Sequence, residues 1–427
     1  MSKQFLKELP GLIRAQIITE ETAQRIKDYY DDQPGQSSNR LFIVFGILGS
    51  LLVGLGIVLI IAHNWDNLSK AIKLSMGFLP LLIGQVVAGV VLTKKREEVA
   101  WREGAATFIF LAIAVSISIV SQVYNIEGDL KGFLFIWMCL ALPVVYVLRS
   151  SVASLLFISG ITWYACEVGY FNYPYDNAPA YWVLLALILP FYYLEFIQKN
   201  LKNNFFYFHS WALALSITIC LGLLADDRGE LMMIAYMSLF SGYVLVSQLE
   251  PFETGRVLSN AYLVIGSAGT IILLLALSFD WYWDELDDIK STTSITPVVV
   301  SIGVTLLSIM LLLFALRSKK WNELNSKSYA FLVFLALFLF GSHFPAFSQV
   351  LVNVVILVLA VRTIRDGAEQ NHLGILNYGL LIITALICCR FFDTDFSFVI
   401  RGLLFIAIGA GFFVTNYYLI QRRRKGA

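Results

Sequence analysis

Charged residues are scarce in this chain of 427 residues. Asp, Glu, Lys and Arg together make up 14% of the sequence, against roughly a quarter in a typical soluble domain. Hydrophobic residues reach 58%, and the charges that remain nearly cancel to a net charge of +1. So small a net charge gives no indication of a nucleic-acid or acidic partner, and we expect no nucleic-acid partner.

Motifs of common soluble enzymes are missing as well. The chain has no nucleotide-binding glycine loop, no G-x-S-x-G and no H-E-x-x-H. Its five cysteines lie inside apolar blocks, and none has the C-x-x-C spacing of a zinc or redox site. The sequence therefore predicts no metal site, no cofactor and no soluble catalytic domain. The alternative is a divalent metal bound by His63, Asp66, Glu127 and Asp129, although these residues lack a fixed ligand spacing.

The sequence consists instead of hydrophobic blocks of about 20 residues, each long enough to cross ~30 Å of hydrocarbon as a helix. We count fourteen blocks, which predicts an all-α fold: a polytopic membrane helix bundle of about 14 transmembrane helices. The predicted spans are 41–63, 71–93, 104–123, 131–148, 151–170, 179–197, 205–224, 231–248, 257–279, 297–317, 328–343, 346–364, 373–390 and 398–420.

Basic residues predict how the bundle is oriented. With the N-terminus inside, 24 of the 31 Lys and Arg residues fall on the inner side of the fourteen spans. Because Lys and Arg are retained on the cytoplasmic side during insertion, we expect both termini in the cytoplasm. The bundle then comprises residues 40–421, and residues 422–427 form a basic cytoplasmic tail.

Residues 1–39 form the only sizeable polar segment, which predicts a short cytoplasmic helical hairpin and a linker. Thr19 is suited to cap the second helix, with Glu20 and Glu21 at its positive end. Two short helices cannot bury a core alone. We therefore expect them to pack on the bundle or to bind a cytoplasmic protein partner.

Three groups of polar residues fall at the predicted outer ends of helices. They are His63, Asn64, Trp65 and Asp66; Gln122, Tyr124, Glu127 and Asp129; and Arg390, Asp393, Asp395 and Arg401. Charges at the hydrocarbon boundary are costly unless they are paired or hydrated, so the two arginines need carboxylate partners. If the helices that carry these groups are neighbours, the three groups form one outward-facing polar pocket.

A simpler interpretation explains the first group by its position alone. Trp65 is typical of the aromatic belt at a membrane surface, and Asp66 or Ser69 can cap the next helix. The sequence leaves both interpretations open.

Several stretches of the chain resemble a family of bacterial membrane proteins. They are GLIRAQIITEETAQRIKDYY, IIAHNWDNLSKAIKL, SQVYNIEGDLKGFLFIWMCLALPVVYVLRS and, near the end, RFFDTDFSFVIRGLLFIAIGAGF. The family is catalogued as domain of unknown function 2157, predicted membrane proteins. The resemblance implies a multi-pass protein of the bacterial inner (cytoplasmic) membrane, and it supplies no reaction.

Fourteen spans with little soluble mass favour a transporter or flippase-like protein, whose substrate is an ion, a small molecule or a lipid from the bilayer. No span carries a clear mid-membrane charge, which counts against proton coupling. The lone polar residues there are Gln85, His209, Asn353 and Asn377, which hydrogen bonds between helices can explain.

Two other functions remain open, so the sequence does not decide whether the protein is an enzyme. The first is a membrane-embedded enzyme acting on a lipid-linked substrate at the outer leaflet. In it, Asp66 would be the general base, and Arg390 or Arg401 would hold a phosphate. The second is a membrane sensor or assembly factor that binds its partner through residues 1–39.

Overall fold

The computed structural model describes most of the chain as helix. The described residues are 9, 11–31, 65–171, 177–199, 204–226, 229–253, 257–280, 282–283, 294–318, 320–341, 344–393 and isolated positions from 399 to 417. No strand occurs among them. The chain divides into two compact units, Met1–Lys73 and Leu74–Ala427.

Ten of the described helical stretches are long and apolar enough to cross a membrane, and two more are shorter apolar helices. Together they coincide with twelve of the fourteen predicted spans, while span 41–63 and most of 398–420 lie outside the described residues. The α-helices are α2 (Glu20–Asp31), α4 (Lys70–Lys94), α5 (Val99–Tyr124), α6 (Leu130–Leu148), α7 (Ser151–Gly169), α8 (Pro179–Tyr192), α9 (Asn204–Leu221), α10 (Gly229–Val246), α11 (Ala261–Ala276), α13 (Thr296–Ser318), α14 (Ala330–Gly341), α15 (Pro345–Glu369) and α16 (Leu373–Asp393). The short helical turns are η1 (Trp65–Asn67), η2 (Tyr193–Ile197), η3 (Gly222–Ala225), η4 (Val257–Ser259), η6 (Trp321–Glu323) and η7 (Ser326–Tyr329).

In the first unit, α2 begins directly after Thr19, whose hydroxyl oxygen accepts the backbone N–H of Thr22 at 3.2 Å. This bond is the N-cap that the sequence predicts. Leu9 and Ala23 are the buried apolar residues described here.

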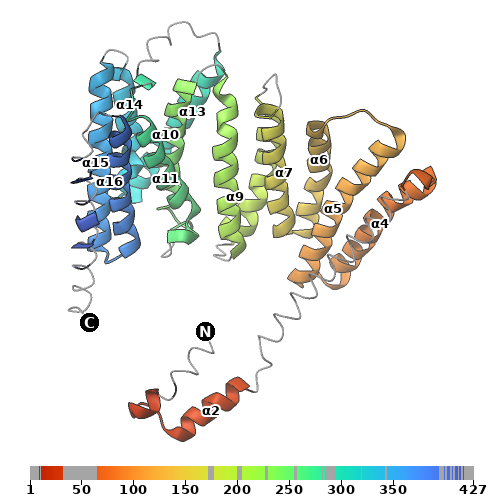
Figure 1. Cartoon of the computed structure of the whole chain (residues 1–427). Helices are drawn as coiled ribbons and strands as arrows, with labels where there is room; N and C mark the ends of the chain where they lie inside the picture. The colour runs from red at the N-terminus through yellow and green to blue at the C-terminus, as the bar shows by residue number, and fades with distance from the viewer. Residues whose placement is uncertain are drawn as a thin grey trace. The chain divides into compact units, whose positions relative to one another are not determined.

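In the second unit, tight caps separate successive helices and make them antiparallel neighbours. Asn125, in the left-handed conformation at φ 47°, ends α5, and Arg149, at φ 46°, ends α6. Ser150 then caps α7 by accepting the N–H of Ala153 at 3.1 Å. The helices of Leu74–Ala427 stand side by side, with α4 to α6 at one end and α14 to α16 at the other (Figure 1).

Glu103 of α5 holds the start of α7. Its carboxylate accepts the backbone N–H groups of Ser151 and Val152, both at 2.9 Å, and the hydroxyl of Ser150. The first N–H groups of a helix have no partner within the helix and carry partial positive charge. The carboxylate therefore fixes the N-terminus of α7 against α5.

We expect Glu103→Ala to destabilise the protein by about 1–3 kcal/mol, because it leaves several partly buried donors unpaired. Thermal unfolding of the purified protein in detergent measures the change as a lower Tm. Glu98→Ala is the matched control, since Glu98 is half exposed and its ion pair among the described residues is with Lys95, a surface contact of about 1 kcal/mol or less. Equal Tm shifts for the two variants would contradict the assigned role of Glu103.

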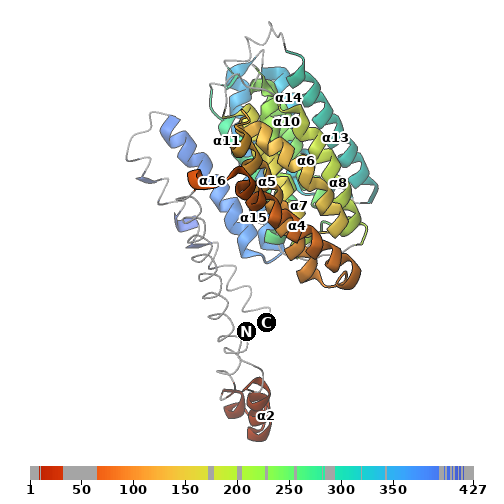
Figure 2. The same cartoon turned by 90° about the vertical axis from the view of Figure 1, so that its right-hand side faces the viewer.

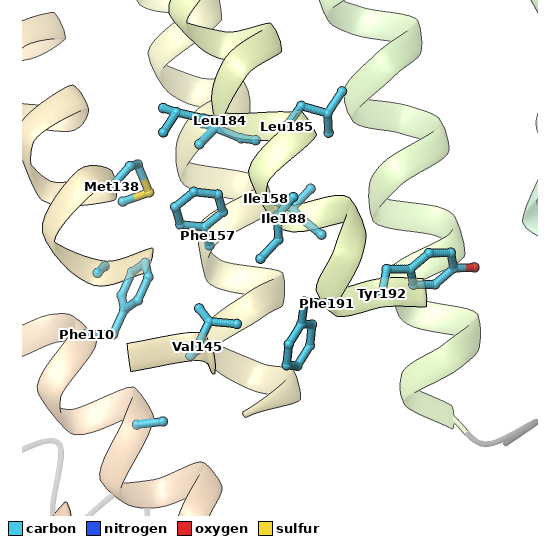
Figure 3. Close-up of a cluster of buried hydrophobic side chains, with 14 of the residues drawn as sticks. Phe110, Met138, Val145, Phe157, Ile158, Leu184, Leu185, Ile188, Phe191 and Tyr192 are labelled. Atoms are coloured by element: carbon cyan, nitrogen blue, oxygen red, sulfur yellow. The ribbon is translucent and has the colours of Figure 1, made fainter. Parts of the chain in front are cut away.

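Buried apolar side chains form two main cores. The first joins residues from α4 to α9, and Figure 3 shows Phe110, Met138 and Phe157 of this core, which come from α5, α6 and α7. The second joins residues from α10 to α16 and includes Phe331 and Phe334. The two cores divide the second unit into an earlier and a later half.

Candidate functional site

A long groove lies between α4, α5 and α6 and has a volume of about 1310 Å³; we call it the α4–α6 groove. Its lining on α6 runs from Leu130, the first residue of the helix, to Leu148, the last. At 1.5 Å per residue, these 19 residues span about 28 Å, close to the ~30 Å thickness of the hydrocarbon. The groove is therefore as tall as the membrane interior.

Small residues bring α4 close to α5 along one side of the groove. A Cβ atom at Gly84 would lie 2.8 Å from Cγ1 of Ile109, and one at Gly77 would lie 3.2 Å from Cβ of Ile119. The Ser116 hydroxyl also donates to the carbonyl of Gly77 at 2.8 Å. Close backbone approach through glycine is a common way to pack helices in membranes.

On the other side, α6 is joined to α5 by Trp137. Its indole N–H donates to the carbonyl of Phe110 at 2.8 Å, and the two rings lie 5.2 Å apart. Helix α5 is thus the floor of the groove, and α4 and α6 are its walls. Figure 2 faces the end of the unit that these helices form.

Polar side chains line the groove at two levels. Gln122, Glu127 and Asp129 lie at one end, where α5 turns into α6. Gln85 lies well inside the groove, near the middle of α4 and next to Gly84. Between these levels, α5 contributes several serines, and most of the remaining lining is apolar.

The turn at the polar end is fixed by local hydrogen bonds. The backbone N–H of Ile126 donates to the carbonyl of Ser121 at 2.9 Å, which closes the end of α5. Asp129 caps α6 by accepting the N–H of Gly132 at 2.9 Å, and it lies 3.5 Å from the Lys131 ammonium. The hydrogen bond from Gly132, with a smaller effect of Lys131, lowers the pKa of Asp129 below its ordinary value.

We expect part of the stability to be lost at acid pH through Asp129. A carboxyl group whose pKa is lowered on folding stabilises the protein at pH values above its unfolded pKa of about 4. This stabilisation is lost as the pH falls through the pKa of the folded state. Asp129→Asn keeps a capping oxygen but cannot titrate, so its Tm should fall less between pH 6 and pH 3.

Glu127→Gln is the control for this experiment, because it removes an exposed carboxylate of the same turn that does not cap α6. If Asp129→Asn and the unchanged protein lose Tm equally with acid, ionised Asp129 contributes nothing to folding.

The structure brings together three residues of the second predicted polar group. Gln122, Glu127 and Asp129 all line the α4–α6 groove. Tyr124, the fourth member, is 56% exposed and is not among the lining residues.

Trp65 and Asp66 of the first predicted group lie in the other compact unit, where η1 precedes α4. Trp65 is half buried and Asp66 is exposed. The Lys73 ammonium lies 5.1 Å from the centre of the Trp65 ring, a cation–π contact. Ser69 caps α4, since its hydroxyl oxygen accepts the N–H of Ile72 at 3.4 Å.

Arg390, from the third predicted group, lies on α16 beside the end of α11. Its guanidinium donates to the Ser278 hydroxyl at 3.2 Å and lies 4.9 Å from the centre of the Phe279 ring. It is not among the residues that line the α4–α6 groove. For Asp393 only the backbone is described, and the other predicted site residues outside the described part of the chain are His63, Asn64, Asp395 and Arg401.

Gln85, one of the lone polar residues in the predicted spans, lines the groove, and its position in the sequence did not predict this. Two of the other lone polar residues bond within their own helices: His209 Nδ1 lies 2.7 Å from the carbonyl of Phe205, and Asn353 donates to the carbonyl of Gln349 at 2.8 Å. Gln85 has no hydrogen-bond partner among the described residues and faces the groove. The stretch SISIVSQ, 116–122, carried a further signal, because its serines and glutamine line the same groove.

Metal binding finds no support in the described residues, where no group of three or more His, Cys, Asp or Glu is placed to hold an ion. Helices α4 and α5 carry no charged residue within the groove, and its acids are the two at its polar end. The arrangement suits hydrogen bonding along an apolar surface.

The groove-lining residues all lie between Phe78 and Leu148. The family described as predicted membrane protein (DUF2157) matches residues 10–154. Residues 10–154 are a DUF2157 region. The resemblance seen in the sequence is therefore confirmed there, and the DUF2157 region contains the whole groove.

No curated protein and no solved structure matches the chain. The family match and the ten long apolar helices together make this a multi-pass membrane protein. Its apolar helices contact the lipid bilayer.

Proposed function

We propose that the protein is a flippase-like transporter, in which the α4–α6 groove carries the headgroup of a membrane lipid while the acyl chains stay in the bilayer. This proposal rests on the length of the groove across the membrane together with its polar side chains. The groove spans the length of α6, has a polar end at Asp129 and holds an amide, Gln85, far from that end.

A lipid headgroup crosses hydrocarbon slowly because it loses its hydrogen bonds with water. Side chains along a groove can replace some of the headgroup's hydrogen bonds with water, which lowers the free-energy barrier to crossing the membrane. Ile136 and Leu140 line the groove on α6 and are 49% and 54% exposed, so the groove is accessible from the surface where acyl chains lie.

The charged lining residues, Glu127 and Asp129, both lie at the polar end. A carrier driven by protons needs an ionisable group that titrates along the route. The proposed transport is therefore facilitated and downhill, without coupling to an ion gradient.

The proposed setting is the bacterial inner membrane, with residues 1–39 and the basic tail 422–427 in the cytoplasm and 40–421 as the bundle. The Asp129 end of the groove then opens outward.

We expect Lys131→Cys to react with an impermeant maleimide in intact spheroplasts and Arg424→Cys only after lysis. Labelling of both from one side would contradict this orientation. We also propose that residues 1–39 bind a protein partner in the cytoplasm.

Transport is tested with the full chain in phosphatidylcholine vesicles that contain traces of lipids with a fluorescent acyl chain. A suitable panel is phosphatidylcholine, phosphatidylglycerol and monoglucosyl-diacylglycerol. Dithionite quenches the outer leaflet at once and the inner leaflet only as lipid moves outward. We expect at least one lipid to move tenfold faster than in protein-free vesicles; if none does, the proposed function is wrong.

A further inference from the structure

Charge is confined to one end of the α4–α6 groove. Among the described residues that line it, the charged ones are Glu127 and Asp129, and neither Lys nor Arg is present. Lys131 lies at the same end and pairs with Asp129. A phosphate within hydrocarbon requires a cationic partner or water, and guanidinium or ammonium groups normally supply the partner. The inner part of the groove offers an anionic headgroup no such partner.

The inner part of the groove instead presents an amide. Gln85 is exposed to the groove and has no hydrogen-bond partner in the described part of the chain. The Ser116 hydroxyl, which also lines the groove, is already engaged, because it shares its hydrogen between the carbonyls of Gly77 and Ala112, at 2.8 and 2.9 Å. A side-chain amide offers two N–H donors and a carbonyl acceptor, and leaving it unpaired in hydrocarbon is costly. Gln85 therefore has capacity for a partner that both donates and accepts.

We infer that the groove carries lipids with an uncharged, hydroxyl-rich headgroup, of the glycosyl-diacylglycerol class, and that Gln85 hydrogen-bonds this headgroup midway. This inference rests on the proposed function. A sugar hydroxyl both donates and accepts, so it matches the amide, and it needs no cationic partner. The volume of about 1310 Å³ exceeds that of ordinary ligand pockets, which leaves room for a sugar beside the start of an acyl chain.

The test compares monoglucosyl-diacylglycerol with phosphatidylglycerol, both with the same fluorescent acyl chain, in vesicles that contain the full-length protein. Both headgroups carry hydroxyls, and only the second is charged. We expect the glucosyl lipid to cross at least tenfold faster. Gln85→Leu should lower its rate at least tenfold, and Gln85→Met, which matches the side chain in length, should do the same.

Asn377→Leu is the matched control, because Asn377 is an exposed lone amide of α16 that does not line the groove. We expect this variant to transport the glucosyl lipid at the same rate as the unchanged protein. Equal acceleration of both lipids refutes the headgroup selectivity and leaves transport standing. No acceleration of either, or of phosphatidylcholine, refutes the proposed function itself. Unchanged glucosyl transport in both folded Gln85 variants refutes the role of Gln85.

Occupancy is tested independently with a photoreactive amino acid at Gly89, a lining residue with open space around it. Irradiation should cross-link it to glucosyl lipid added to the vesicles, and to phosphatidylglycerol at least fivefold less. Cross-links to protein alone would show that a helix, and not a lipid, occupies the groove, and would overturn the inference.

Discussion

Replacing Gly89 with Trp is expected to abolish lipid transport while the protein remains folded. Gly89 lines the α4–α6 groove, and a Cβ atom added there meets no other atom within 4 Å. With a groove volume of about 1310 Å³, we expect an indole at this position to enter the groove without forcing α4 away from α5. Because the groove is the proposed route, we expect the transport rate to drop at least tenfold with a Tm change of a few degrees at most.

Gly303→Trp is the matched control for Gly89→Trp. Gly303 is an exposed helical glycine of α13 with open space at its Cβ position, and it is not part of the groove. The two variants add the same side chain to a helix surface, so any difference in transport comes from the groove. Equal rates in both variants would mean that lipid does not pass between α4 and α6.

The second large effect concerns stability, and it lies at Gly367 in the hairpin of α15 and α16. A Cβ atom at Gly367 would lie 2.4 Å from the backbone nitrogen of Leu376 and 2.7 Å from its Cα atom. At Gly379, on the facing helix, it would lie 2.8 Å from the backbone nitrogen of Ile364. These neighbours are backbone atoms, so no side-chain rotation relieves the clash.

Gly367→Val must therefore push the two helices apart, and overpacking of this kind typically costs about 1–3 kcal/mol. We expect a Tm a few degrees lower in detergent, or failure to accumulate in the membrane. Gly303→Val adds the same side chain at an open position and should leave Tm nearly unchanged. If the two valine variants unfold at the same temperature, α15 and α16 are not packed as described.

The membrane helices could be predicted from the sequence because hydrocarbon leaves the backbone few alternatives. An unpaired N–H or C=O is so costly there that an apolar block of about 20 residues becomes a helix. Helix ends followed from local chemistry in the same way, as the cap at Thr19 shows. The number fourteen remains a prediction, since spans 41–63 and 398–420 lie largely outside the described residues.

The site was predictable only in part, because these helices are apolar on every side. In a soluble helix the polar residues mark the outer face, whereas here they do not show which face meets which neighbour. Residues close in sequence, Gln122 to Asp129, could be grouped correctly. Gln85 could not be grouped with these residues from the sequence, because its position depends on how α4 packs against α5 at Gly77 and Gly84.

Arg390 illustrates the same difficulty over a longer distance in the chain. The sequence suggested a carboxylate partner, and its described contacts include a hydroxyl and an aromatic ring. Cation–π contact is a second way to accommodate a guanidinium near hydrocarbon, and sequence spacing does not reveal it. The enzyme hypothesis, which uses Arg390 or Arg401 beside Asp66, therefore gains no support from the described contacts of Arg390.

The boundary at residue 154 cuts through the first hydrophobic core. Met138 and Val145 of α6 are fully buried, and the same core contains Phe157 of α7 and Ile188 of α8, which lie beyond that boundary. A chain cut at residue 154 would expose this face of α6 and lose the partner against which the wall of the groove is braced. The unit that packs together is thus larger than the region that the family matches, and we expect fragments limited to residues 10–154 to aggregate.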